Sequence, residues 1–310
     1  MKKLIHLACI VFVVGIALLP SCKEDESNDP PKAGIFSSIV DKQVAFTALT
    51  KRAETFNWDF GDGESSTEMN PVHVYKEGGI YSVKLTVTGN GATVEATTEV
   101  SLALSDIQML TGGSKAVNGK KWKISSAHSS KDGFALADDN FTVVQPIGTG
   151  MLGNVGLGLG EVYDDEFIFK FDGTYIHAPQ HGGAFAGLVY TMINQKTILK
   201  ATPTSQSFGL CYTAYNPEAE ATFTLTGEKD LVVTTVSTNG NTATERTYKD
   251  VMTLNFSGTE FIGFMDFMRE CIVQEITPDK MRIAMFVSTT QKTYYNKPSY
   301  VIILTFEVVK

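Results

Sequence analysis

Four carboxylates lie close together at residues 161–166, in the order Glu-Val-Tyr-Asp-Asp-Glu. Glycoside hydrolysis requires two carboxylates that flank the scissile bond. In a regular strand, however, Glu161 and Glu166 would point to opposite faces, and Asp165 would share a face with the apolar Phe167. We therefore interpret the run as the charged entry to a strand, expect no catalytic residues, and rank a glycoside hydrolase as the third hypothesis for function.

The same acids are also candidates for binding a cation. Ca²⁺ prefers clustered oxygen ligands, which Asp164 could provide together with Asp138, Asp139 or Asn140. Asp139 and Asp164 are the candidate calcium ligands, and this structural ion is the only cofactor that we consider; otherwise we expect none.

Two histidines four residues apart suggest a zinc site at first sight. His177 and His181 would share a helix face, but Pro179 and the glycines that follow prevent a helix. Zinc also needs further ligands, and no Cys or His cluster provides them. We expect a polar loop over 177–183 whose two imidazoles are candidate ligand-binding groups.

A glycine-rich run at residues 148–160 contains the spacing G-x-G-x-x-G, at Gly148, Gly150 and Gly153. A dinucleotide site needs this spacing between a strand and a helix, in a βαβ unit. No helical pattern follows, so we expect a surface loop and no nucleotide.

Aromatic side chains in loops could stack on sugar rings beside polar hydrogen-bonding groups. The candidates are Tyr163, Tyr190, Tyr212, Tyr215, Tyr294 and Tyr295. For any single tyrosine, a half-buried strand position with a solvated hydroxyl is the commoner role. The predicted ligand-binding set is Tyr163, His177, His181, Tyr294 and Tyr295. We expect at least two of the loops 148–160, 177–183 and 292–298 to meet on one concave face, with Tyr294 or Tyr295 exposed.

Short apolar runs separated by turn residues predict that residues 120–310 form one large β domain. Asn239-Gly240 is a strong hairpin signal. Phe261–Met268 is the best helical pattern, although Gly263 disfavours a helix. The expected strands are 122–124, 166–171, 185–193, 223–226, 231–236, 251–256, 271–276, 281–287 and 300–309. The fold class is therefore all-β, with a jelly roll or a lipocalin-like barrel in this domain. Residues 105–119 are interpreted as a linker.

Residues 34–104 show three motifs in order. Trp58-Asp-Phe-Gly-Asp-Gly63 ends a strand in a tight turn, Asn70-Pro-Val-His-Val-Tyr75 is extended, and Gly79–Val87 alternates apolar and polar residues. This segment resembles a PKD domain, an immunoglobulin-like β-sandwich that mostly spaces, orients or binds on bacterial surfaces. We expect Trp58 and Trp122 to be core residues and His73 to be structural.

The rest of the chain carries a looser resemblance. The series W-K-I, Y-D-D-E-F-I-F-K-F-D-G-T-Y, F-I-G-F and I-T-P-D-K-M-R-I is similar to the C-terminal domain of PKD-bearing surface lipoproteins of glycan-utilisation systems. The resemblance implies glycan binding. Those relatives often carry Trp-Trp ahead of the D-D-E strand, where this chain has its glycine-rich run.

Residues 1–21 have the pattern of a lipoprotein signal peptide. Lys2 and Lys3 precede an apolar stretch, and Leu-Pro-Ser-Cys22 resembles a bacterial lipobox, which makes Cys22 the predicted lipidation site. Residues 22–33 are acidic and almost without apolar side chains, so we expect a disordered tether. Such a tether resembles the export tag of surface lipoproteins in Gram-negative bacteria, which implies an outer-membrane location facing the exterior.

Charge excludes one class of partner. Removing the signal takes away two lysines and no acid, so the net charge changes from −8 to −10. Nucleic-acid binding is excluded because phosphate contacts need clustered Lys and Arg. Cys211 and Cys271 could be bridged or free, since sequence does not supply the geometry.

These observations predict a non-catalytic lipoprotein whose C-terminal domain binds a polysaccharide or oligosaccharide, with the PKD domain as spacer. The alternative is a surface scaffold that docks another protein, such as another uptake protein. The lipid of the outer membrane would be the partner of the N-terminal anchor.

Overall fold

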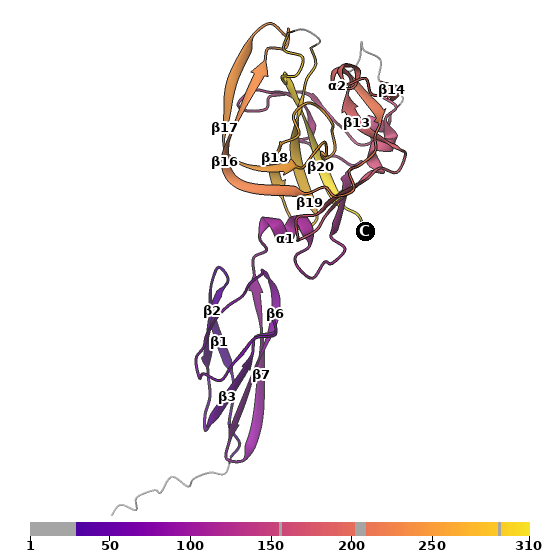
Figure 1. The fold of residues 1–310 in the computed structure, drawn as a ribbon. Coiled ribbons are helices and arrows are strands. Elements are labelled where there is room, and N and C mark those ends of the chain that lie inside the picture. The colour runs from indigo at the N-terminus through magenta and orange to yellow at the C-terminus, as the bar shows by residue number, and fades with distance from the viewer. Residues whose placement is uncertain (1–28, 155–156, 202–208, 291–292) are drawn as a thin grey trace, which may run out of the picture. The chain divides into compact units, whose positions relative to one another are not determined.

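The computed structural model describes residues 29–154, 157–201, 209–290 and 293–310 (Figure 1). The predicted signal peptide and Cys22 lie outside these residues. The chain divides into two compact units, one formed by the residues up to Tyr75 with Ile80–Val100, the other by Lys76–Gly79 with Ser101–Lys310. In the described part of the chain, no helix has the length and apolar character needed to cross a membrane.

The N-terminal unit is a sandwich of two antiparallel sheets. One sheet has the order β1-β2-β5, and the other the order β4-β3-β6-β7. The strands are β1 (Ile35–Val40), β2 (Gln43–Ala48), β3 (Thr55–Asp59), β4 (Ser65–Ser66), β5 (Val72–Val74), β6 (Gly79–Gly89) and β7 (Ala92–Leu102).

Trp58 lies at the centre of this sandwich. It is fully buried, its ring centroid is 5.3 Å from that of Phe46, and its indole Nε1 donates to the carbonyl of Glu68 at 2.9 Å. Residues 81, 83, 85 and 87 of β6 are all buried, which confirms the predicted alternation. Burial of an aromatic ring with its N–H satisfied is a main source of stability in a unit of this size.

The turn at 61–63 depends on its aspartates and glycines. Asp59 Oδ1 accepts from the Gly61 N–H at 2.9 Å, and Asp62 Oδ1 accepts from the N–H of Glu64 at 3.0 Å. Gly61 has φ 80°, and a Cβ there would lie 2.6 Å from the carbonyl oxygen of Ser82. His73 is buried, stacks on Phe60 and lies 2.8 Å from Asp62 Oδ2, so its predicted structural role is confirmed.

The C-terminal unit is built from one large sheet and one small sheet, which confirms the all-β class. Its main sheet has the order β12-β11-β8-β20-β19-β18-β17-β16, with β9 pairing both β20 and β10; a second sheet has the order β13-β15-β14. The elements are α1 (Asp106–Thr111), β8 (Lys120–Ile124), β9 (Gly133–Leu136), β10 (Val143–Pro146), η1 (Met151–Gly153), η2 (Gly160–Tyr163), β11 (Glu166–Phe169), β12 (Tyr175–Ala178), β13 (Gly183–Gly187), α2 (Leu188–Ile193), β14 (Ile198–Ala201), β15 (Leu210–Ala214), β16 (Phe223–Val236), β17 (Ala243–Phe256), β18 (Cys271–Ile276), β19 (Lys280–Val287) and β20 (Tyr300–Val308).

The main sheet curls until its two end strands meet. At the first residues of β12 and β16, the Tyr175 N–H donates to Ala221 O at 2.9 Å, and the Phe223 N–H donates to Gly173 O at 3.0 Å. The enclosed core is packed with aromatic rings, among them Phe169 against Phe223 at 4.9 Å between centroids. The interior of the curled sheet is thus a packed core, as in small barrels.

The end of the long hairpin β16–β17 folds over the face of the main sheet that points away from the enclosed core. Its register shifts between Thr226 and Leu231, so the hairpin bends (Figure 1). The first half of β16 belongs to the enclosed core, whereas Leu231 and Val233 pack on Phe286 and Ile303 in a second core. Asn239-Gly240 lies in the connection between the strands, as predicted, with Gly240 at φ 75°.

One expectation about local structure was wrong, the strand over 185–193, and Phe261–Met268 does not form the helix that Gly263 disfavours. Phe261–Met268 is irregular because Gly263 has φ 63° and Met265 forms an isolated bridge with Ala186. The strand expected over 185–193 ends at Gly187, where a Cβ would lie 2.3 Å from Asp266 Oδ2, and α2 follows. Residues 105–119, interpreted as a linker, contain α1.

Candidate functional site

A loop over residues 293–299 presents the one predicted tyrosine with clear exposure. Tyr295 is 37% exposed, whereas Tyr294 is half-buried. The loop is tied down at its end: Pro298 O accepts from the Val236 N–H at 2.8 Å, and the Ser299 N–H donates to Val287 at 3.0 Å. Because these hydrogen bonds hold the end of the loop to the sheet, they restrain the position of Tyr295.

A groove of 450 Å³ lies beside this loop. It is lined by Val232–Thr234 of β16, by Phe267 and Met268, and by Asn296–Pro298. The Phe267 and Tyr295 rings meet edge to face, with centroids 5.5 Å apart. The groove therefore combines an aromatic wall with the amide of Asn296 and the ammonium of Lys297, the mixture of apolar and orienting polar groups that small ligands require.

Phe267 is itself held in place by buried neighbours. Its ring packs edge-on against Tyr190 at 5.1 Å, and the Tyr190 hydroxyl accepts from Arg269 Nη2 at 2.8 Å. The Arg269 guanidinium also lies over the rings of Tyr190 and Phe261, at 5.3 and 5.8 Å. This arrangement fixes the aromatic wall before any ligand arrives, which lowers the entropic cost of binding.

A second, smaller groove of 190 Å³ lies beyond Pro298–Ser299, along the next residues of β16. It is lined by Leu136–Asp138, Thr235–Thr238, Thr242, Thr244, Arg246 and Ser299. Arg246 pairs with Asp139 at 2.8 Å and donates through Nε to Thr235 Oγ1 at 3.2 Å. The loop 293–299 thus has hydrogen-bonding groups on one side and the aromatic wall on the other.

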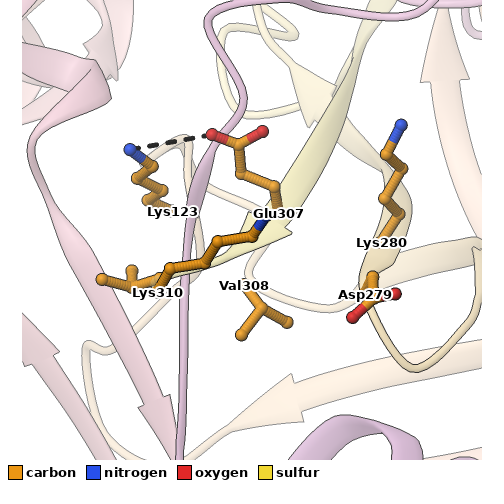
Figure 2. Close-up of a pocket in the computed structure, with 7 residues that line it drawn as sticks. Lys123, Asp279, Lys280, Glu307, Val308 and Lys310 are labelled. Atoms are coloured by element: carbon orange, nitrogen blue, oxygen red, sulfur yellow. Dashed lines mark ion pairs between the residues drawn. The ribbon is translucent and has the colours of Figure 1, made fainter.

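A third groove, of 590 Å³, is lined by charged residues near the end of β20 (Figure 2). Figure 2 shows the Lys123–Glu307 pair on one side, with Lys280 and Asp279 across from it; the pair is 3.6 Å apart. Its lining includes no aromatic residue. It is larger than the groove beside Tyr295 but lacks a surface on which a sugar ring could stack.

Tyr163 has a structural position in the glycine-rich segment. Its hydroxyl accepts from the Leu152 N–H at 3.1 Å and lies 2.7 Å from His128 Nε2. His128 in turn pairs with the buried Asp132 at 2.9 Å. Tyr163 therefore holds the 3₁₀ turns η1 and η2 together, and the described residues of 148–163 contain no strand–turn–helix of the dinucleotide type. Tyr190, Tyr212 and Tyr215 are buried.

The expected loop position of His177 was wrong. His177 lies in β12, is 3% exposed, and packs against Phe167 at 4.8 Å between ring centroids. Burial among aromatic rings lowers its pKa to about 3, so the imidazole is neutral at physiological pH. A ligand outside the protein does not reach this side chain.

The other predicted loops meet at Asp164 and Asp165. His181 Nε2 lies 2.8 Å from Asp164 Oδ2 at the surface, and the Gln180 N–H donates to Asp165 Oδ1 at 3.2 Å. The loop after β12 and the segment after the glycine-rich run thus come together, but neither contributes to the lining of the groove beside Tyr295. His181 is the predicted imidazole that remains at the surface.

The proposed calcium ligands are separated in the structure. Asp139 pairs with Arg246, and Asp164 pairs with His181. Within the described ranges, no group of three or more His, Cys, Asp or Glu side chains is arranged to hold a metal ion. Both Cys211 and Cys271 are free and buried.

The structure contains a buried cluster of ionisable groups that the sequence did not predict. His177 lies between Asp165 and Glu260, with Nε2 4.0 Å from Asp165 Oδ2 and Nδ1 3.9 Å from Glu260 Oε2. Burial raises the pKa of Asp165 to about 7 and also raises the pKa of Glu260, which accepts from the Tyr215 hydroxyl at 2.7 Å. The sequence signal for the burial of His177 is the alternation along β12. His177 lies two residues after the buried Tyr175, and therefore on the same face of the strand.

Comparison with known proteins identifies only the first part of the chain. The family model described as PKD domain matches residues 28–102. Collagenase ColA of Bacillus cereus is 44% identical over 59 residues, and that match covers 17% of this chain and 6% of the collagenase. Collagenase ColA of Clostridium perfringens is 40% identical over 75 residues, covering 22% of this chain and 7% of the enzyme. The chain therefore spans less than a tenth of these relatives.

Two similar solved structures differ in how much of this chain they cover. The PKD1 domain of Vibrio anguillarum Epp is 31% identical, with 25% of this chain and 99% of that chain covered and a TM-score of 0.24. A structure of carbohydrate-binding modules of the β-sandwich superfamily covers 91% of this chain and 92% of its own, but at 14% identity and a TM-score of 0.25. An identity and a TM-score this low do not assign the second unit to a family. The family match and the motifs at Trp58–Gly63 and His73 agree, and the N-terminal unit of this chain is a PKD domain.

Proposed function

We propose that this chain is a non-catalytic surface lipoprotein that binds a polysaccharide or oligosaccharide through its C-terminal unit, with the PKD domain as spacer. The observation that supports this most directly is the groove beside Tyr295. Beside the groove, the exposed Tyr295 ring packs edge to face on the lining residue Phe267, and Asn296 belongs to the same lining. Sugar rings present apolar faces and hydroxyl edges, and this pair of surfaces matches both.

The charged residues argue against hydrolysis. A glycosidase needs one protonated and one ionised carboxyl group at the substrate. The acids whose pKa is raised by burial are Asp165, Glu260 and Asp266, and all three are buried. The partly exposed acids near β11 have basic partners, since Glu161 pairs with Lys200 and Glu166 with Lys121. Hydrolysis therefore remains the third hypothesis.

Protein docking remains the alternative function. A scaffold would use the same loops, because exposed loops on a rigid sheet serve either purpose. The lipid anchor at Cys22 and the location on the outer membrane are part of this proposal and rest on the N-terminal sequence alone.

The test is a binding screen of the chain from residue 22 onward, with Cys22→Ser, against plant, host and microbial polysaccharides by affinity electrophoresis. Retardation by at least one glycan, without release of reducing sugar, is the expected result. If no glycan retards the protein, the carbohydrate proposal fails and docking becomes the better account. Sugar release that persists on further purification would favour an enzyme.

A further inference from the structure

The outer strand of the PKD domain has an unpaired edge without the usual protection. β1 ends the β1-β2-β5 sheet, and no strand within the described residues pairs with its other side. Natural proteins protect such edges with charges, prolines, bulges or covering segments. The sequence of β1 is Ile-Phe-Ser-Ser-Ile-Val, with no charge and no proline, and its pairing with β2 is regular throughout.

The hydrogen-bonding groups on this edge can be assigned. The Leu49 N–H donates to Gly34 O at 2.9 Å, so Gly34 bonds towards β2. Antiparallel strands alternate between residues that bond to one neighbour and residues that bond to the other. Phe36, Ser38 and Val40 therefore bond to β2, and the N–H and C=O groups of Ile35, Ser37 and Ile39 face the open edge.

The outer face of this sheet is also apolar. In β2, Val44 and Phe46 are buried while Gln43 and Ala45 are exposed, which defines the outer face. By register, Phe36, Ser38 and Val40 of β1 and Val72 and Val74 of β5 share this face. The four large apolar side chains are strongly exposed: Phe36 58%, Val40 70%, Val72 57% and Val74 61%.

β1 is complementary to itself. In an antiparallel pair with a two-fold axis at Ser38, Ser37 and Ile39 of one copy exchange hydrogen bonds with Ile39 and Ser37 of the other. Phe36 of each copy then lies opposite Val40 of the other on the outer face, and the two Ser38 residues face each other. A two-fold interface requires this kind of self-matching surface.

The strand itself carries no charge that would repel a second copy. Lys32 precedes β1, and Asp41 and Lys42 follow it in the turn to β2. We propose that β1 is a homotypic docking strand, through which two copies of this chain join their β1-β2-β5 sheets into one continuous six-stranded sheet.

The interface is small, so the association should be weak. Strand pairing over six residues with two Phe36–Val40 contacts buries less than the roughly 1,200–2,000 Å² of standard complexes, which places it among transient interactions. Anchoring in a membrane would raise the effective concentration and favour the pair. The proposal is independent of glycan binding.

The test uses sedimentation equilibrium of the chain from residue 22 onward with Cys22→Ser, up to ~1 mM, the range in which transient complexes form. We expect a reversible monomer–dimer equilibrium. Ser38→Lys and Ser38→Asp should each abolish it through like charge at the two-fold axis, and an equimolar mixture of the two should restore a mixed dimer. Gln43→Lys, on the same face of β2, should leave dimerisation unchanged.

The register of the β1–β1 pairing is tested by disulfide formation between introduced cysteines. Ser38→Cys should give a covalent dimer, because non-hydrogen-bonded antiparallel partners have Cα atoms about 4.5 Å apart, within disulfide range. Ser37→Cys lies opposite Ile39 and should not crosslink. A monomer at all concentrations, a dimer insensitive to Ser38→Lys, failure of the mixture, or crosslinking through Ser37→Cys instead would each overturn the proposal. Near-ultraviolet circular dichroism verifies that each variant is folded.

Discussion

Asp165→Asn should stabilise the C-terminal unit, and the gain should grow with pH. Asp165 is buried beside His177, with Oδ1 accepting from the Gln180 N–H and Oδ2 4.0 Å from His177 Nε2. Burial raises the pKa of this carboxyl from the ordinary 3.8 to about 7. Asparagine keeps the shape and the acceptor for Gln180, and its amide nitrogen offers a donor towards the imidazole.

The magnitude follows from linkage. A carboxyl whose pKa is raised on folding binds its proton more tightly in the folded state. Its contribution to the free energy of unfolding is therefore complete at low pH, and it is lost as the pH rises from the pKa of the unfolded state to the pKa of the folded state. The interval from 3.8 to about 7 corresponds to a loss of about 4 kcal/mol for the wild type, at 1.36 kcal/mol per pH unit. Asparagine has no charge to bury, so the variant escapes this loss.

The assay is urea unfolding followed by the fluorescence of Trp122. The chain has two tryptophans, and Trp58→Phe in both proteins leaves only the reporter in the C-terminal unit. The free energy of unfolding of the variant minus that of the parent should increase by about 4 kcal/mol between about pH 4 and pH 8. The control is the neighbouring Asp164→Asn, which removes a surface ion pair with His181 and should change stability by less than ~1 kcal/mol. A flat difference across this range would refute the buried-charge reasoning.

Three further results are expected. Cys22→Ala should release the protein from the membrane fraction, because it removes the lipid anchor; if the variant still fractionates with the outer membrane, the lipobox interpretation is wrong. Trp58→Ala should destabilise the PKD domain by roughly 3–5 kcal/mol in chemical unfolding and leave glycan binding intact; a fully stable variant would contradict its central burial. Gly61→Ala should also destabilise the PKD domain, since the new Cβ would meet Ser82 O at 2.6 Å; unfolding at the parental urea concentration would contradict this.

Local signals predicted the PKD domain well because its important contacts are encoded within short segments. The Asp59 and Asp62 side chains cap the turn two residues further on, and the glycines have the positive φ that the turn requires. Alternation in β6 and in β11 likewise identified the buried faces. In such segments a residue's environment depends on its neighbours in sequence.

The candidate site was less predictable because tertiary contacts decide it. Pro179 and Gly182 indicated a loop around His177, but the strand extends to Ala178 and places the imidazole beside the rings of Tyr215 and Phe261, which come from distant loop segments. Glu260 and Asp266 are buried although both are acidic. The Tyr215 hydroxyl donates to Glu260 Oε1, and the N–H groups of Phe267 and Ser288 donate to Asp266, whereas Glu260 Oε2 has no hydrogen-bond partner among the described residues. Tyr295 was correctly singled out as exposed, yet its partner Phe267 comes from a segment with the pattern of a helix.

The most direct test of the central claim compares two exposed aromatic residues. Tyr295→Ala removes the ring that packs on the lining residue Phe267, and Phe171→Ala removes a similarly exposed ring, 40% accessible, in the turn after β11. Calorimetric titration with an oligosaccharide of the glycan that binds best should show a loss of about 1–3 kcal/mol for Tyr295→Ala, the scale of an aromatic contact, and none for Phe171→Ala. Unchanged affinity in Tyr295→Ala, or an equal loss in both variants, would contradict a sugar site in this groove.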